Sequence, residues 1–278
     1  MPEALRIRDF RLLWAARLVS LLGSWLLVVA VPAHVFLLTG SVAATGLTLA
    51  AEFLPAVVLG PLAGVLVDRG DRRHVMIAAD VVRAGAVALL VLVRQPGDVW
   101  LVYTALMVES AGTVVFRPAA QAHTPAVVGT GPALSSATTL NGVTDGAVRL
   151  IGPPLGGALF AWAGFEVLVW LDVGTYLLSA MGILRTARRP ATVDRAVDAA
   201  GRVVGDIREG LAFLRADRTA GALLLVNTLF LGANACLTAL LIPYGVDVLG
   251  GAGQIGLVMW LLLADPLGQS RPREIGLS

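Results

Sequence analysis

Long apolar runs alternate with short polar segments along most of the chain. A run of about 20 apolar residues is long enough to cross the hydrocarbon core of a bilayer as an α-helix. Seven such runs follow one another: Leu12–Leu38, Val42–Val67, Val75–Val93, Val99–Phe116, Thr138–Trp162, Phe165–Leu184 and Ala220–Pro243. The pattern predicts an all-α membrane protein with seven spanning helices. A further apolar stretch near Ile255 holds only about ten residues, fewer than a spanning helix needs.

The composition supports a membrane protein and excludes other classes. Hydrophobic residues make up 57% of the 278 residues, charged residues only 14%, and the mean hydropathy is +0.81. A water-soluble domain needs more polar surface than this. The formal net charge is only +2, and the arginines lie at the edges of apolar runs, unlike the clustered charge that binds nucleic acid. We therefore expect the lipid bilayer as a partner and no nucleic acid.

The placement of arginine predicts the orientation of the helices. Short cytoplasmic loops collect positive charge, whereas outer loops do not. Arginines precede the first run, lie between the second and third, follow the fourth, and number eight from Arg185 to Arg218. The opposite loops contain only Arg94. We therefore expect a cytoplasmic amino terminus and a cytoplasmic segment between the sixth and seventh helices.

The same pattern divides the chain into three parts. Residues 1–184 form an amino-terminal six-helix bundle, residues 185–219 a cytoplasmic linker, and residues 220–278 the incomplete start of a second half. Within the linker, apolar residues recur on one face of a predicted helix from Val203 to Leu214. This helix either lies on the membrane surface and joins two bundles, or is a solvated linker that takes no part in the chemistry.

One polar segment, GVLVDRGDRR from Gly64 to Arg73, holds more than the positive charge of an ordinary cytoplasmic loop. Asp68 ends a predicted helix, where the helix dipole disfavours an anion, so another group must compensate it. Gly64, one turn earlier, allows another helix to approach closely. Gly70 permits a tight turn, and Asp71 can cap the following helix. The arginines that favour the cytoplasmic side of this loop are Arg69, Arg72 and Arg73.

This segment resembles the signature loop G-x-L-x-D-R-x-G-R-[KR] of the major facilitator superfamily, with Asp71 where the family usually has glycine. Three other segments resemble the branch that holds macrolide-efflux and enterobactin-exporter-like proteins: RDFRLLWAARLVSLLGSW, FRPAAQAHTP and RLIGPPLGGALF. The resemblance implies two six-helix halves around a central substrate site. It also implies that Asp68 faces the amino end of a helix in the other half and stabilises the outward-facing state, while the arginines form a cytoplasmic charge network.

A glycine and proline pattern recurs in two of the predicted helices. GPLAG, from Gly60 to Gly64, is repeated in GPPLG, which begins at Gly152. The repeat is either a trace of inverted three-helix repeats or chance, because both residue types are common in such helices. The second copy also resembles the tail of the antiporter motif, G-P-x-x-G-G, but its upstream glycine is replaced by Val148. The predicted helix-packing motif comprises Gly152, Pro153, Gly156 and Gly157.

Ionisable groups inside spanning helices are costly, so they are candidates for function. Glu52 and Glu109 have no nearby charge of opposite sign in the sequence, and either can carry a coupling proton. Asn141, Asp145 and Arg149 recur every fourth residue, which places them on one face of a helix. They form either the wall of a watery cavity or, for Asp145 and Arg149, a structural ion pair.

Further charges lie inside the predicted spans. Asp80 and Arg83 are three residues apart and are expected to pair, and Asp172 lies in the sixth run. Arg17 is expected to extend to the inner membrane surface. Related exporters often have an acid just after the glycine of the first helix, where this chain has Ser24.

No motif of an enzyme is present. Gly251 to Gly256 match G-x-G-x-x-G but follow a membrane helix rather than a strand. The three histidines lack metal-ligand spacing and no P-loop occurs, so we expect no enzyme activity, cofactor or metal.

We therefore expect a proton-coupled exporter of amphipathic small molecules, such as a drug, macrolide or siderophore, in a bacterial plasma membrane. The polar ending DPLGQSRPREIGLS does not resemble the next span of such a carrier, so we expect this chain to be truncated, to lack its carboxyl-terminal half and to be inactive alone. The alternative is a non-transporting membrane remnant, or a scaffold subunit that needs a partner chain.

Overall fold

The structure is a computed structural model that describes residues 3–68, 71–187, 205, 209 and 217–247. These residues form helices and contain no strand. The long helices are α1 (Arg8–Thr39), α2 (Val42–Asp68), α3 (Arg72–Ala88), α4 (Val99–Val128), α5 (Pro132–Ala163), α6 (Phe165–Leu184) and α8 (Arg218–Asp247). Three 3-10 helices accompany them: Glu3–Arg6, Leu89–Leu92, which continues α3, and Pro96–Asp98, which leads into α4. The expectation of an all-α membrane protein is confirmed.

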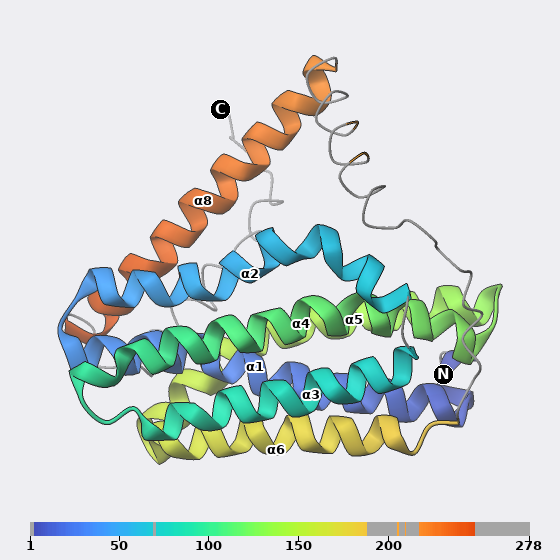
Figure 1. Cartoon of the computed structure of the whole chain (residues 1–278), viewed down its shortest axis with the longest axis horizontal. Helices are drawn as coiled ribbons and strands as arrows, with labels where there is room; N and C mark the ends of the chain where they lie inside the picture. The colour runs from blue at the N-terminus through green and yellow to red at the C-terminus, as the bar shows by residue number, and fades with distance from the viewer. Residues whose placement is uncertain (1–2, 69–70, 188–204, 206–208, 210–216, 248–278) are drawn as a thin grey trace, which may run out of the picture.

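Five helices, α1, α3, α4, α5 and α6, lie side by side with their axes roughly aligned (Figure 1). α1 packs most extensively on α6 and α5, and α3 packs on α4 and α6. α2 lies along α4 and has few contacts with α3. α8 runs obliquely to the bundle and contacts it through α2 and α1.

Glycines end two of the helices where the backbone reverses. Gly40 follows α1 with φ +62° and donates its N–H to the carbonyl of Phe36 at 2.8 Å. Gly164 is the single residue between α5 and α6 and has φ +83°. A residue with a Cβ is strained at positive φ, so glycine allows these connections to be short.

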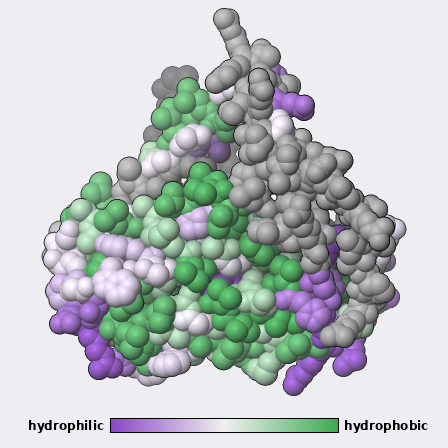
Figure 2. Space-filling model, viewed as in Figure 1, coloured by the Kyte–Doolittle hydropathy of each residue, from purple (hydrophilic) through white to green (hydrophobic). Residues whose placement is uncertain are grey.

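The surface carries the polarity of a membrane-embedded bundle. Figure 2 shows apolar side chains across the middle of one face and hydrophilic ones toward its two lower corners. Large apolar side chains are widely exposed, among them Val57 at 74% and Phe53 at 57%. A water-soluble protein rarely exposes so much contiguous apolar surface, whereas lipid chains cover it favourably.

Five of the seven predicted spans are confirmed as helices that are long and apolar enough to cross a membrane. They are Arg8–Thr39, Val42–Gly60, Arg72–Leu92, Pro96–Val128 and Phe165–Leu184. α5 and α8 form as predicted but are not among the five: α5 carries the polar face, and the stretch of α8 that is described without interruption is the shorter apolar segment Thr219–Phe230. α4 and α5 extend beyond their apolar runs. Backbone hydrogen bonds continue a helix past the membrane, whereas an apolar run marks only the part of the helix that lies in lipid.

Several predictions fall mainly or wholly outside the described residues. They concern the amphipathic helix Val203–Leu214, the short apolar stretch near Ile255 and the glycine-rich segment that begins at Gly251. The division of the chain into two bundles and a linker likewise stays a prediction.

Candidate functional site

Asp71, the residue that departs from the superfamily loop pattern, caps α3. Its carboxylate accepts a hydrogen bond from the backbone N–H of Arg73 at 3.0 Å and contacts Nδ1 of His74 at 2.8 Å. The predicted capping role is therefore confirmed. Partial burial alone raises the pKa of Asp71, but the hydrogen bonds from Arg73 and His74 outweigh it and leave the pKa below its ordinary value.

Two arginines of this loop bind backbone carbonyls of neighbouring helices. Arg72 donates from Nη1 to the carbonyl of Ala122 in α4 at 3.0 Å. Arg73 is buried and donates to the last carbonyls of α6, from Nε to Ile183 at 3.1 Å and from Nη2 to Leu184. The carboxyl end of a helix carries partial negative charge, which favours a guanidinium there. These arginines therefore connect the loop to α4 and α6, beyond any effect on membrane orientation.

The rest of the loop motif is described only in part. Gly64 and Asp68 lie in the last turns of α2, and nothing is described of their side chains. Arg69 and Gly70 lie outside the described residues. The conformational role of the loop stays a prediction.

Asp71→Ala should destabilise the protein by about 1 kcal/mol, the usual cost of losing an N-cap. Asp71→Asn, which keeps an acceptor for the Arg73 amide, should lose less. Because the folded pKa lies below the ordinary value of 3.8, the stabilisation by the carboxylate is present above that pH and is lost as the pH falls through the lowered pKa. Thermal unfolding of the purified proteins, followed by circular dichroism at pH 7 and pH 3, measures both effects. An equal deficit of Asp71→Ala at the two pH values would contradict the assignment.

A buried ion pair holds the centre of α3. Asp80 and Arg83 pair within one helical turn, and their side chains are 0% and 5% exposed. The guanidinium carbon of Arg83 lies 4.3 Å from the ring centre of Phe116 and 4.5 Å from that of Tyr176, so two aromatic faces also stabilise the cation. The predicted structural pair is confirmed.

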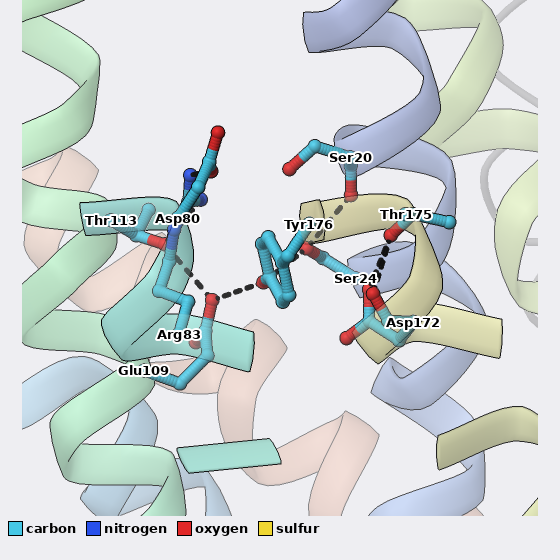
Figure 3. A network of polar contacts seen from close by, with 9 residues as sticks. All are labelled: Ser20, Ser24, Asp80, Arg83, Glu109, Thr113, Asp172, Thr175 and Tyr176. Atoms are coloured by element: carbon cyan, nitrogen blue, oxygen red, sulfur yellow. Dashed lines mark hydrogen bonds and ion pairs between the residues drawn. The ribbon is translucent and has the colours of Figure 1, made fainter. Parts of the chain in front are cut away.

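Glu109 lies at the centre of a hydrogen-bond network between α4 and α6 (Figure 3). Its Oε1 accepts from the hydroxyl of Tyr176 at 2.7 Å and from the hydroxyl of Thr113 at 2.9 Å. Arg83 also donates to Thr113 at 3.2 Å, which joins the ion pair to the network. Glu109 forms no ion pair among the described residues, but two hydroxyls bind its carboxylate and Arg83 lies one hydroxyl away.

The network continues from Tyr176 to α1. The hydroxyl of Tyr176 lies 2.8 Å from that of Ser24, and Ser24 Oγ lies 3.1 Å from the carbonyl of Ser20. Ser24 stands where the resemblance to related exporters implies an acid. In this chain the carboxylate comes from α4, and Tyr176 links it to α1 (Figure 3).

Asp172 is a second buried acid in this region, and it packs directly on α1. Its side chain is 1% exposed, and Oδ1 accepts from the hydroxyl of Thr175 at 3.0 Å. A Cβ added to Gly23 would lie 2.1 Å from the same oxygen. Glycine at position 23 therefore makes room for the carboxylate between α1 and α6.

Glu52, the other candidate proton carrier, lies on α2 against α4. Its backbone carbonyl accepts from the hydroxyl of Ser110. Its carboxylate makes no hydrogen bond or ion pair with the residues that the structure describes. Glu52 is thus separate from the hydroxyl network around Glu109.

The polar face of α5 packs against α1. Nη2 of Arg17 lies 2.7 Å from Oδ2 of Asp145, an ion pair that the sequence did not indicate. The expectation that Arg17 extends to the inner membrane surface stays a prediction. Asp145 also does not form the alternative pair with Arg149, because α1 brings a guanidinium closer than the next turn of α5 does. Arg149 instead lies over Trp25, with its guanidinium carbon 6.0 Å from the ring centre. Asn141 lies one turn before Asp145 on the same face.

The glycines of the predicted packing motif lie where α5 crosses α1. A Cβ on Gly152 would lie 2.5 Å from Cβ of Trp25, and a Cβ on Gly156 would lie 2.3 Å from the carbonyl oxygen of Leu26. Pro153 and Gly157 are buried beside them. The absence of side chains therefore sets the distance between the two helices.

An apolar groove of about 720 Å³ lies between α2, α3 and α4, lined by residues such as Val58, Val82 and Val108. It is separate from the polar groups described above. Among the described residues, no group of three or more His, Cys, Asp or Glu side chains could hold a metal ion.

Ionisable groups inside apolar helices are expensive, and membrane proteins keep them where an ion or a substrate must bind. The apolar helices and these buried groups define a multi-pass membrane protein. The chain belongs to the transmembrane secretion effector family of the major facilitator superfamily, whose sequence profile matches residues 3–262.

Several relatives of this chain are named as efflux proteins. Macrolide efflux protein A of Streptococcus pyogenes is 30% identical over 244 residues, which cover 87% of this chain and 60% of the relative. The multidrug efflux pump Tap of Mycobacterium tuberculosis is 27% identical over 283 residues, 95% of this chain and 66% of the relative. An uncharacterized transporter of the superfamily from Bacillus subtilis, YfiS, is 31% identical over 73% of this chain and 48% of its own length. The matched region thus spans between about half and two thirds of each of these relatives.

Tyr176 and Thr113 are residues of the network that the sequence did not indicate, and Tyr176 is the one that links two helices. It lies in an apolar helix, 67 positions from Glu109, and a single tyrosine in such a run resembles an ordinary core residue. Only the packing of α6 against α4 identifies its role.

Proposed function

We propose that this chain supplies the amino-terminal half of an exporter that moves amphipathic small molecules out of the cell and is driven by the proton gradient. Its amino terminus lies in the cytoplasm. The observation that carries the proposal is the chain of hydroxyls from the Glu109 carboxylate through Tyr176 to Ser24. The efflux proteins among the relatives support the direction of transport.

The hydroxyl chain has two complete arrangements of its protons. With Glu109 ionised, Ser24 donates to Tyr176 and Tyr176 donates to Glu109. With Glu109 protonated, the direction reverses: Glu109 donates to Tyr176, Tyr176 donates to Ser24, and Ser24 donates to the carbonyl of Ser20. Both arrangements satisfy every hydroxyl, so the site can hold or release one proton without leaving a buried donor unpaired.

Proton binding at Glu109 also changes how the helices are connected. The ionised carboxylate accepts charge-assisted hydrogen bonds from α6 and from its own helix, which are stronger than those of a neutral acid. Protonation weakens the link between α4 and α6 and lowers the attraction between Glu109 and the neighbouring Arg83. A proton taken from outside thereby favours one arrangement of the bundle over the other.

Asp68→Asn should slow efflux about tenfold at equal membrane abundance in a carrier that contains both halves. A carboxylate facing a helix amino end is worth up to about 2 kcal/mol in one conformational state, and each 1.4 kcal/mol is tenfold. The measurement is the accumulation of a basic drug, erythromycin, and of an acidic one, novobiocin, in a bacterial host stripped of its own exporters, with and without a protonophore. Glu166→Gln, which removes an exposed carboxylate in the first turn of α6, is the matched control and should behave as wild type.

The transport proposal fails if cells with the wild-type two-half carrier accumulate as much erythromycin, and as much of other amphipathic drugs, as the empty host does. The scaffold alternative then gains support. Undiminished efflux by the Asp68→Asn carrier would contradict the conformational role of the loop but not the transport proposal.

A further inference from the structure

Arg149 presents a charged side chain at the middle of a membrane helix. It lies near the centre of the 32-residue α5, and its side chain is exposed. It makes no ion pair with any carboxylate among the described residues, although Asp145 lies one turn earlier. A guanidinium at this depth cannot face lipid without a large cost, so it faces a water-filled space or a bound group.

Arg17 of α1 and Asn141, Asp145 and Arg149 of α5 form a polar surface, the α1–α5 wall, that carries a surplus positive charge. Arg17 and Asp145 neutralise each other across 2.7 Å, which leaves the charge of Arg149 uncompensated. Nη1 of Arg17 is a buried donor with no hydrogen-bond partner among the residues that the structure describes. Oδ1 of Asp145 and Oδ1 of Asn141 are buried acceptors that likewise have no hydrogen-bond partner among those residues. Arg149 is therefore the exposed cation of this wall, and three polar atoms behind it have hydrogen-bonding capacity that the described residues do not use.

Trp25 provides an apolar surface beside this charge. Its ring is half-buried near the middle of α1, 6.0 Å from the Arg149 guanidinium carbon. The close approach of Gly152 to the Cβ of Trp25 fixes the position from which the indole ring extends. An indole face next to a guanidinium suits a ligand that carries an aromatic or flat apolar body and an acidic group.

We propose that Arg149 and Trp25 recognise the anionic group and the adjoining aromatic surface of an acidic amphiphile as the exported substrate. The inference rests on the proposed efflux function and narrows its substrate class. A substrate with a charged amine at this position is disfavoured, because the amine faces an unpaired guanidinium. In this proposal the acidic group that binds Arg149 belongs to the exported small molecule. In the alternative, a carboxylate of the protein binds Arg149 in the same place.

Two probes of one shape test the proposal on this 278-residue chain. The anionic probe is 8-anilinonaphthalene-1-sulfonate, and the neutral probe is N-phenyl-1-naphthylamine, which lacks only the sulfonate. The purified chain is titrated with each by fluorescence in phosphatidylcholine nanodiscs, and empty nanodiscs give the lipid background. The variants are Arg149→Gln, Arg149→Lys and, as a control for the lost charge, Arg94→Gln in the loop before α4.

Arg149→Gln should weaken binding of the anionic probe about tenfold, as expected for losing one charged hydrogen bond. Binding of the neutral probe should stay within about twofold, which also shows that the variant is folded. Arg149→Lys should retain most of the affinity for the anionic probe, because it keeps the charge. Arg94→Gln should change neither affinity.

Equal wild-type affinity for the two probes, or unchanged affinity for the anionic probe in Arg149→Gln, would overturn the proposal and indicate a protein carboxylate as the partner of Arg149. The absence of specific binding of the anionic probe would overturn it as well. None of these results bears on whether the carrier exports drugs, which the accumulation assay decides separately.

Discussion

Glu109→Gln should abolish most proton-driven efflux while leaving the carrier folded. Glutamine keeps an oxygen that can accept from Tyr176 and Thr113, so the helices stay connected, but it cannot take up a proton. Losing a charge-dependent hydrogen bond of about 1.5–3 kcal/mol in one state corresponds to a fall of about tenfold to a hundredfold in rate. The measurement is drug efflux from energised vesicles that contain the carrier with both halves, over a range of external pH.

Tyr176→Phe and Glu52→Gln complete this experiment. Phenylalanine preserves the ring beside Arg83 but removes the hydroxyl that joins Glu109 to Ser24, so the pH profile of efflux should shift even if substrate binding survives. Glu52 is outside the hydroxyl network, and Glu52→Gln should retain the pH dependence. Wild-type pH dependence in Glu109→Gln would remove Glu109 as the proton carrier. Loss of the pH dependence in Glu52→Gln alone would transfer the role to Glu52.

Gly156→Ala should lower the stability of the bundle by about 1–3 kcal/mol, the usual cost of overpacking, because its Cβ would lie 2.3 Å from the backbone oxygen of Leu26. Backbone atoms cannot rotate away as a side chain can, so α1 and α5 must move apart. Gly146→Ala is the matched control on the same helix, since nothing lies within 4 Å of its Cβ. Alanine there should be neutral or stabilising by up to about 1 kcal/mol, because it favours the helix.

Thermal unfolding in detergent, followed by circular dichroism, measures this difference between the two alanine variants. A Gly156→Ala protein as stable as Gly146→Ala would show that the helices adjust at little cost and that the contact does not set their spacing. Because α5 also positions Asp145 and Arg149, Gly156→Ala should weaken binding of the anionic probe together with stability.

The sequence by itself determined the parts of this protein that depend on neighbouring residues. Apolar runs located the helices, because a helix must contain about 20 apolar residues to cross the hydrocarbon core of a bilayer. Asp80 and Arg83 were paired correctly because residues three apart meet on one helix face whatever surrounds them. Asp71 was assigned as a helix cap from its position before α3, and the structure agrees.

The tertiary structure alone decided which helices exchange polar contacts. Arg17 pairs with Asp145 at a separation of 128 positions, where the sequence left a choice between a cavity wall and the local partner Arg149. Tyr176 binds Glu109 through the packing of α6 on α4. In a water-soluble helix an apolar stripe marks the buried face, but in lipid both the buried and the exposed faces are apolar. The rotation of each helix about its axis, and with it the partner of each buried charge, is therefore set by the packing of small residues such as Gly23 and Gly156 between helices.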